Sequence, residues 1–182
     1  MKIFFDTEFT GLHKDTTLIS IGCVDEDGRT FYAEFNDYDK SQCNDWIQKN
    51  VIDNLKFNHV ETIVDNGDDF YYIKDNKANI RDAFAQWLQE YKCVEFVSDV
   101  CHYDMVLLID IFGTAFDLPK GVNAACHDIN QDIADWYSCS ETEAFDKSRE
   151  GFLIDHELYF DGDKHNALYD AKVIKEIYGY IR

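Results

Sequence analysis

The chain has 182 residues, of which 46% are hydrophobic and 15% aromatic, with a single proline. This length suits one compact domain, and the composition excludes a wholly disordered chain. A formal net charge of -19 argues against a nucleic-acid partner, unless clustered carboxylates hold divalent cations that reverse the local charge.

Three consecutive strands are predicted at the start of the chain. They cover Lys2–Glu8, Leu18–Val24 and Thr30–Phe35, and residues 25–28 form the turn between the second and the third. Because they follow one another with short connections, we expect them to pair antiparallel.

The next predicted helix begins after Asp75 or Asn76. Apolar residues recur in it at helical spacing: Ile80, Ala83, Phe84, Trp87, Leu88 and Tyr91. A buried strand is then expected at Val94–Val97, and a helix crossover of this kind favours parallel pairing. The remaining elements are expected to be mostly helical, with Met105–Phe112 and about 166–180 as helices and with irregular stretches at 37–75 and 138–163.

Targeting and redox signals are few in this sequence. The six cysteines form no CxxC pair and no short Cys/His spacing, so we expect reduced thiols rather than a zinc site. The apolar opening is too short for a signal peptide, and no apolar run reaches membrane-spanning length. We therefore expect a soluble, cytoplasmic protein that has no membrane partner.

The segment Phe4-Phe5-Asp6-Thr7-Glu8 places two carboxylates two positions apart. On a strand, Asp6 and Glu8 point to the same face. Like charges so close are relieved by a cation between them, and carboxylate oxygens suit Mg²⁺ or Mn²⁺. The alternative is that Glu8 lies beyond the strand end and both groups are solvated.

A second group of acidic side chains follows the predicted strand at Val94–Val97. Asp99 comes directly after it, and Asp104 begins the next helix. Functional sites collect where strands of an α/β sheet end. A carboxylate at a helix start can equally be only a cap, and that alternative applies to Asp104.

The third segment is His165-Asn166-Ala167-Leu168-Tyr169-Asp170-Ala171. On one continuous helix, His165 and Asp170 would lie roughly 140° apart, so they converge only if His165 belongs to the loop before the helix. The small residues Ala167 and Ala171 allow this helix to approach the sheet closely. The alternative for His165 is an ordinary surface histidine.

Together, the three segments resemble the motifs of the DEDDh 3'-5' exonucleases, the group of ribonuclease T, oligoribonuclease and proofreading exonucleases. The resemblance spans Asp6 to Asp170, and the opening is also similar to the ribonuclease AS-like subgroup. The second motif departs from the usual H-N-x-x-F-D, since Asp99 and Val100 take the His-Asn positions and Tyr103 the aromatic one.

The resemblance implies an α/β fold: a ribonuclease H-like mixed β-sheet, with three antiparallel N-terminal strands plus parallel strands, flanked by helices. It implies one DEDDh exonuclease domain over residues 1–182. Two divalent metal ions, Mg²⁺ or Mn²⁺, would be held about 3.5–4 Å apart. Their expected ligands are four carboxylates, with Asp99 as a secondary candidate: Asp6, Glu8, Asp104 and Asp170.

The implied reaction is 3'-5' removal of nucleoside 5'-monophosphates from single-stranded nucleic acid, with RNA favoured. One ion would activate water and the other would stabilise the leaving oxygen, while His165 acts as general base. Residues around the first motif would bind the 3' nucleotide, although core packing is the alternative for Phe9 and Leu12. These expected substrate-binding residues are Thr7, Phe9, Thr10, Gly11 and Leu12.

Two other functions remain open on the sequence alone. One is a 3'-5' exodeoxyribonuclease on single-stranded DNA ends, because the motifs do not reveal what reads the 2'-hydroxyl. The other is a catalytically inactive acidic binding protein with the same fold. Many relatives in this group are homodimers, and a homodimer is therefore expected here as well. The acidic runs at 65–69 and 161–163 lack the spacing of an EF-hand loop.

Overall fold

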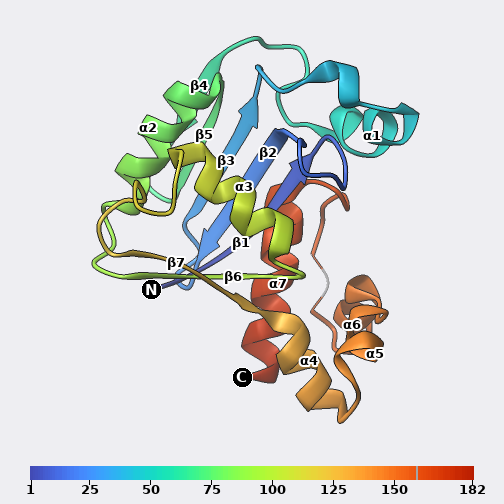
Figure 1. Ribbon diagram of the computed structural model, residues 1–182. Coiled ribbons are helices and arrows are strands. Elements are labelled where there is room, and N and C mark those ends of the chain that lie inside the picture. Colours follow the sequence, from blue (N-terminus) through green and yellow to red (C-terminus); the bar gives the residue numbers. More distant parts are fainter. Residues whose placement is uncertain (159) are drawn as a thin grey trace.

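The centre of the fold is a mixed β-sheet, seen in the computed structural model, which describes residues 1–158 and 160–182 (Figure 1). Within these residues, seven strands lie in the order β4-β5-β3-β2-β1-β6-β7. Their bounds are β1 Lys2–Phe9, β2 Leu18–Asp25, β3 Thr30–Phe35, β4 Ile63–Asn66, β5 Phe70–Asp75, β6 Val94–Ser98 and β7 Val122–Asp128.

Strand directions confirm the expected sheet type. β1, β2 and β3 form an antiparallel meander, while β6 pairs parallel to β1 and β7 parallel to β6. At the other side, β5 pairs parallel to β3, and β4 returns antiparallel to β5. The predicted antiparallel N-terminal strands and the parallel strand after the helix are both confirmed.

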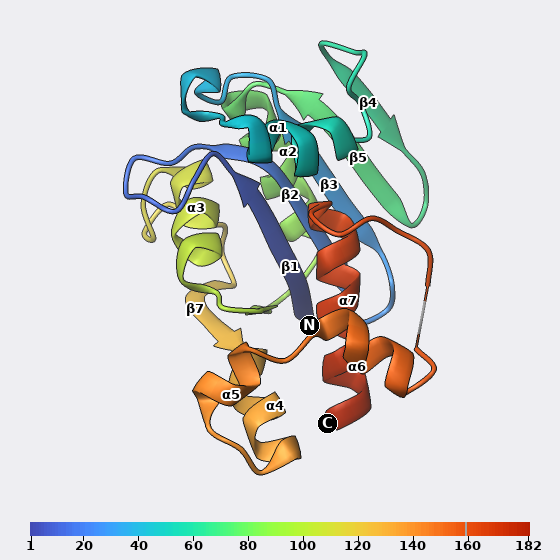
Figure 2. The same cartoon turned by 90° about the vertical axis from the view of Figure 1, so that its right-hand side faces the viewer.

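Helices cover both faces of this sheet (Figure 2). α2 and α3 pack on one face, and α7 packs on the other with α4 and α6 beside it. In the described part of the chain, no helix is long and apolar enough to cross a membrane. The bounds are α1 Asp45–Asn50, α2 Lys77–Leu88, α3 His102–Phe112, α4 Ile129–Tyr137, α5 Glu141–Phe145, α6 Arg149–Asp155 and α7 Ala167–Ile181, with 3₁₀ turns at Lys40–Gln42 and Ile52–Asn54.

Alternation along β1 separates the two faces. Ile3 and Phe5 belong to the core under α2 and α3, whereas Phe4 belongs to the core under α7. Strand side chains alternate with a period of two, so Asp6 and Glu8 continue the Phe4 side. The carboxylates of β1 therefore point toward the face on which α7 packs.

The stretch 37–75 was predicted as irregular, and that prediction was wrong. It contains α1, and also a hairpin whose turn starts at Gly67, where the Gly67 N–H donates to the Phe70 carbonyl over 2.9 Å. The acidic run at 65–69 is thus the end of β4 and the hairpin turn, and Asn66-Gly67 is a common hairpin signal. β7 was also missed, because none of its positions is fully buried and its sequence gives no apolar alternation.

Candidate active site

Asp6 and Glu8 lie next to each other on the α7 side of β1, near its C-terminal end. Asp6 is paired in register with Gly22 of β2, and Glu8 with Ser20. Asp6 is half-buried and Glu8 is buried, with 9% of its surface exposed. The alternative of two solvated carboxylates beyond the strand end does not hold, because β1 runs to Phe9.

Gly22 lets helix α7 reach this part of the sheet. A Cβ atom at Gly22 would lie 2.3 Å from the Leu168 nitrogen and 2.4 Å from the Ala167 carbonyl carbon, which no real contact allows. Ala167 and Ala171 are fully buried in the same contact region. The small residues on the helix were recognised in the sequence, whereas the glycine opposite them was not. Close approach of α7 brings Asp170 beside the carboxylates of β1.

Asp104 enters the site from α3 and is bound to β1. Its Oδ1 accepts hydrogen bonds from the Thr7 N–H at 3.1 Å and from the Thr7 hydroxyl at 2.5 Å. The N-cap position of α3 belongs to Cys101, which makes no side-chain capping bond. Burial raises the pKa of Asp104 to about 6, and the two bonds from Thr7 oppose that rise. Asp104 is therefore not the helix cap, and its carboxylate is held against β1 instead.

His165 lies in the loop before α7, which is the condition for it to converge with Asp170. It has a positive φ of 65°, and its N–H donates to Oδ2 of Asp170 over 2.9 Å. Its Nδ1 is 4.0 Å from Oε1 of Glu8. Burial, and then the charge of Lys164, lowers the pKa of the His165 imidazole from its usual 6.5. Both effects favour the neutral ring, which is the form that can accept a proton.

The clustered carboxylates are poorly suited to full ionisation without a cation. Burial is the main cause that raises the pKa of Asp6 well above its usual range, and the charge of Asp104 adds to it. Burial and the charge of Asp170 raise the pKa of Glu8 to about 8. Burial also raises the pKa of Asp170 to about 7, although the His165 N–H opposes this. A divalent cation would stabilise the ionised carboxylates against both their burial and their mutual repulsion.

The arrangement of ligand atoms fits a metal ion. One ligand atom from each of Glu8, His165 and Asp170 lies within 4.8 Å of the others. Asp6 and Asp104 line the same pocket. Hard carboxylate oxygens are the ligands that Mg²⁺ and Mn²⁺ prefer. The donor set therefore matches the predicted cofactor, and the assignment of individual ligands stays a prediction.

These side chains open into a pocket of about 530 Å³. Two exposed aromatic residues, Trp46 of α1 and Phe145 of α5, belong to its lining, and the Trp46 ring meets the His165 ring edge-on with 5.0 Å between centroids. Cationic side chains line it too, namely Arg149 and Lys164. Sequence reasoning missed these four residues: Lys164 precedes the third motif without belonging to it, and the other three lie in segments without a recognisable motif.

The expected substrate-binding residues lie in different environments. Phe9 both packs against the core and lines the pocket, where it stacks on Tyr103 with 5.4 Å between centroids. Gly11 and Leu12 line the pocket, and Leu12 is 79% exposed. Thr7 also lines it, but its hydroxyl is bound to Asp104, as described above.

Thr10 is buried, unlike its pocket-lining neighbours Gly11 and Leu12, and its expected contact with substrate stays a prediction. Only 2% of Thr10 is exposed, and it is not among the described residues that line the pocket. Its hydroxyl bonds with Gln42 and with the hydroxyl of Thr16 at 3.1 Å, and it accepts from the Thr17 N–H at 2.9 Å. Thr10 instead ties the loop after β1 to the neighbouring segment.

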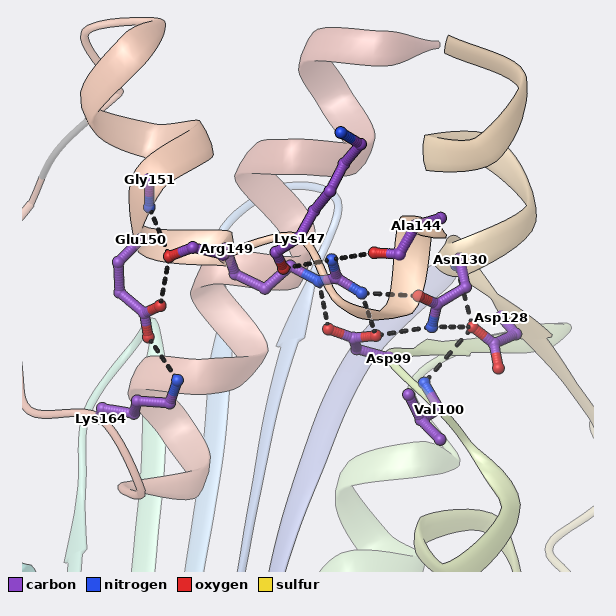
Figure 3. A network of polar contacts seen from close by, with 11 residues as sticks. Asp99, Val100, Asp128, Asn130, Ala144, Lys147, Arg149, Glu150, Gly151 and Lys164 are labelled. Atoms are coloured by element: carbon purple, nitrogen blue, oxygen red, sulfur yellow. Dashed lines mark hydrogen bonds and ion pairs between the residues drawn. The ribbon is translucent and has the colours of Figure 1, made fainter. Parts of the chain in front are cut away.

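Asp99, the secondary candidate ligand, lines the pocket, and its carboxylate is paired with the Arg149 guanidinium. Its Oδ2 accepts from Nε of Arg149 at 2.6 Å, and its Oδ1 accepts from Nη2 at 2.9 Å (Figure 3). Two parallel bonds of this kind are the strongest form of a carboxylate–guanidinium pair. Both oxygens of Asp99 are thus bound to Arg149, while its charge still adds to the raised pKa of Asp6, Asp104 and Asp170.

Comparison with solved structures shows a shared fold. Pop2p of S. pombe, in its Mg²⁺- and Mn²⁺-bound form, superposes with a TM-score of 0.64 and 16% identity, over 100% of this chain and 82% of that chain. The nuclease domain of 3'hExo, a DEDDh family member bound to rAMP, gives a TM-score of 0.66 and 13% identity, over 99% and 90%. The expected ribonuclease H-like fold is confirmed.

Comparison of sequences identifies the family. Two curated relatives from Mycobacterium tuberculosis, the 3'-5' exoribonucleases Rv2179c and MT2234.1, are each 40% identical over 55 residues. The matched stretch covers 30% of this chain and only 33% of each relative. The profile of the 3'-5' exoribonuclease Rv2179c-like domain, in contrast, matches residues 1–182. This chain therefore belongs to the Rv2179c-like 3'-5' exoribonuclease domain family.

Proposed function

We propose that this protein is a metal-dependent 3'-5' exonuclease that removes nucleoside 5'-monophosphates from the 3' end of single-stranded RNA. The observation that carries this proposal is the convergence of four carboxylates from β1, α3 and α7 beside one neutral histidine: Asp6, Glu8, Asp104 and Asp170, with His165. A surface formed only for binding has no need of this combination.

The four carboxylates would hold two divalent ions. Mg²⁺ or Mn²⁺ bound there supplies Lewis-acid activation of water and of the phosphate oxygens. Thr7 orients the Asp104 carboxylate through its two hydrogen bonds, and the His165 N–H orients that of Asp170. Because these two carboxylates are already oriented, they need little rearrangement when the cations and the substrate bind.

His165 would accept the proton of the attacking water. Its imidazole lies at the pocket beside Glu8, and its lowered pKa favours the neutral form that a general base needs. The His165 side chain is 32% exposed and lies on the loop directly before α7. It is therefore accessible to a water molecule beside the substrate phosphate.

The exposed apolar rim would hold the terminal nucleotides. Trp46 and Phe145 offer aromatic faces on which bases can stack, Leu12 adds apolar surface beside them, and stacking tolerates any base. RNA is favoured over DNA because the curated relatives are exoribonucleases and the 3'hExo domain was solved with rAMP. Lys164 is 58% exposed and gives this acidic protein a cation at the pocket for a phosphate.

Matched 5'-labelled single-stranded RNA and DNA test the proposal, each incubated with Mg²⁺, with Mn²⁺ and with EDTA. We expect a ladder that shortens from the 3' end of RNA and disappears with EDTA. Shortening of DNA alone would favour the exodeoxyribonuclease, and no cleavage of either strand would favour an inactive acidic binding protein. We also infer that residues 1–182 act as a single catalytic domain, and the homodimer remains a prediction.

A further inference from the structure

The turn between β6 and α3 is held in a strained conformation. Val100 has a φ of 54°, in the left-handed region that a β-branched residue avoids because its Cβ crowds the backbone. Such a conformation persists only where surrounding contacts hold it. This turn connects Asp99 to the first turn of α3, so its shape decides where the Asp104 carboxylate lies.

Arg149 supplies the strongest of these contacts from the beginning of α6. Besides its two bonds to Asp99, its Nη1 donates to the carbonyls of Ala144 and Lys147, each at 2.9 Å, and its Nη2 donates to Oδ1 of Asn130 at 2.6 Å. A guanidinium has five N–H donors, and all five are used here. Arg149 thus joins the α5–α6 segment to the end of β6 (Figure 3).

Asn130 and Asp128 complete the network from the β7–α4 junction. The Asn130 side-chain amide donates to Asp99 at 2.7 Å and to Asp128 at 2.8 Å. Oδ1 of Asp128 also accepts from the N–H of the strained Val100 at 3.3 Å. Contacts from α4, α6 and β7 therefore converge on the same two turn residues.

We propose that Arg149 is a positioning residue for the metal site. By clamping the Asp99 carboxylate, it keeps the strained turn at Val100 in place, and the turn keeps Asp104 beside the other carboxylates. This inference rests on the proposed function, which assigns Asp104 to the metal ions.

Two other roles fit the contacts less well. Arg149 has no N–H donor left for a substrate phosphate, whereas the ion pair of 3.1 Å to Glu150 is the one contact of the Lys164 ammonium among the described residues. As a metal ligand, Asp99 would have to share both of its oxygens with the guanidinium. A positioning role explains why Arg149 and Asp99, which both line the pocket, are bound to each other.

A double-mutant cycle measured by calorimetric Mn²⁺ titration tests this proposal. The proteins are the unaltered chain, Arg149→Lys, Val100→Gly and the double variant, with circular dichroism to confirm folding. Arg81→Lys is the matched control, because Arg81 pairs only with the exposed carboxylate of Asp82 in the described contacts. A lysine cannot reproduce the bidentate pair, whereas glycine adopts a positive φ without strain.

We expect Arg149→Lys to raise the Kd for Mn²⁺ about tenfold or more, as removal of outer-shell support does elsewhere. In the Val100→Gly background, the same substitution should raise the Kd less than about threefold. Arg81→Lys should leave the Kd unchanged. If Arg149→Lys fails to fold, Asp99→Asn replaces it in both backgrounds, with the same expectation.

Equal loss of Mn²⁺ affinity in both backgrounds, or no loss in either, would overturn the positioning role of Arg149 while leaving the proposed function intact. Absence of Mn²⁺ binding by the unaltered chain would instead contradict the proposed function, and the inference would fall with it.

Discussion

The backbone N–H of His165 donates a hydrogen bond to the Asp170 carboxylate over 2.9 Å, so the two ends of the last motif are bound to each other. This bond depends on the positive φ of His165, which turns its N–H back toward the first turn of α7. The same contact places the imidazole near Glu8 and orients one expected metal ligand. A loop residue and a helix residue thereby form one unit.

Replacement of His165 by alanine should separate proton transfer from metal binding. We expect kcat to fall by about a hundredfold or more, the usual size of a general-base contribution, while Mn²⁺ affinity stays within about threefold. Steady-state cleavage of RNA and calorimetric titration measure the two quantities, with the exposed His59→Ala as control. A parallel loss of Mn²⁺ affinity would show that His165 is a metal ligand instead.

Trp46 should contribute to substrate binding through its exposed face. Trp46→Ala should raise KM for RNA about tenfold, since a stacked base is worth roughly 1–3 kcal/mol, and Trp46→Phe should retain most of the affinity. Trp136→Ala is the matched control, because Trp136 is similarly exposed, 47% against 52%, and is not among the described residues that line the pocket. An unchanged KM in Trp46→Ala would remove the stacking role.

The contact between Gly22 and α7 should not tolerate a methyl group. Gly22→Ala would place a Cβ against the helix backbone, so we expect a loss of about 1–3 kcal/mol or more in the free energy of unfolding. Gly179→Ala, on the same helix with nothing within 4 Å, should instead stabilise by roughly 0.5–1 kcal/mol. Urea denaturation compares the two, and equal stability of both variants would contradict the close approach.

The raised pKa of Glu8 predicts an unusual pH dependence of stability. Because the folded pKa is about 8 against a usual 4.5, the folded state favours the protonated carboxyl. Its contribution to stability is fully present below about pH 4.5 and is lost as the pH rises through about 8. The Tm of the metal-free protein should therefore fall across this range, and Mn²⁺ should restore it.

Glu8→Gln should weaken this pH dependence and raise the Tm of the metal-free protein at pH 8 by a few degrees, about the shift that 1 kcal/mol produces. It should also remove the stabilisation by Mn²⁺. The exposed Glu61→Gln is the control, and calorimetric scans in chelator are the measurement. A Tm that rises with pH in the metal-free protein would disprove the predicted electrostatics.

The features of the site that could be predicted from the sequence depend on residues close together in the chain. Alternation on a strand was enough to place Asp6 and Glu8 on one face, and the five-residue spacing showed that His165 converges with Asp170 only from the loop before the helix. Neither pattern could predict that Asp104 is bound to Thr7, because that contact joins residues 97 positions apart in the chain.

Longer-range features had no local signal. Trp46 and Phe145 join the pocket only because α1 and α5 reach it from distant parts of the chain. Strand β7 has no fully buried position, so its sequence lacks the apolar pattern that marked the first three strands. Gly22 appears as an ordinary strand residue until the helix that packs on it is known.

The most direct test of the active site is the rate at which 5'-labelled RNA is shortened with Mn²⁺ by Asp170→Asn, compared with Asp155→Asn on an exposed side chain. Both proteins should fold, since the amide keeps an oxygen that can accept the His165 N–H. We predict that Asp170→Asn lowers the rate at least about a hundredfold and Asp155→Asn leaves it unchanged. A rate in Asp170→Asn within about threefold of the unaltered chain would contradict the assignment of this cluster as the catalytic centre.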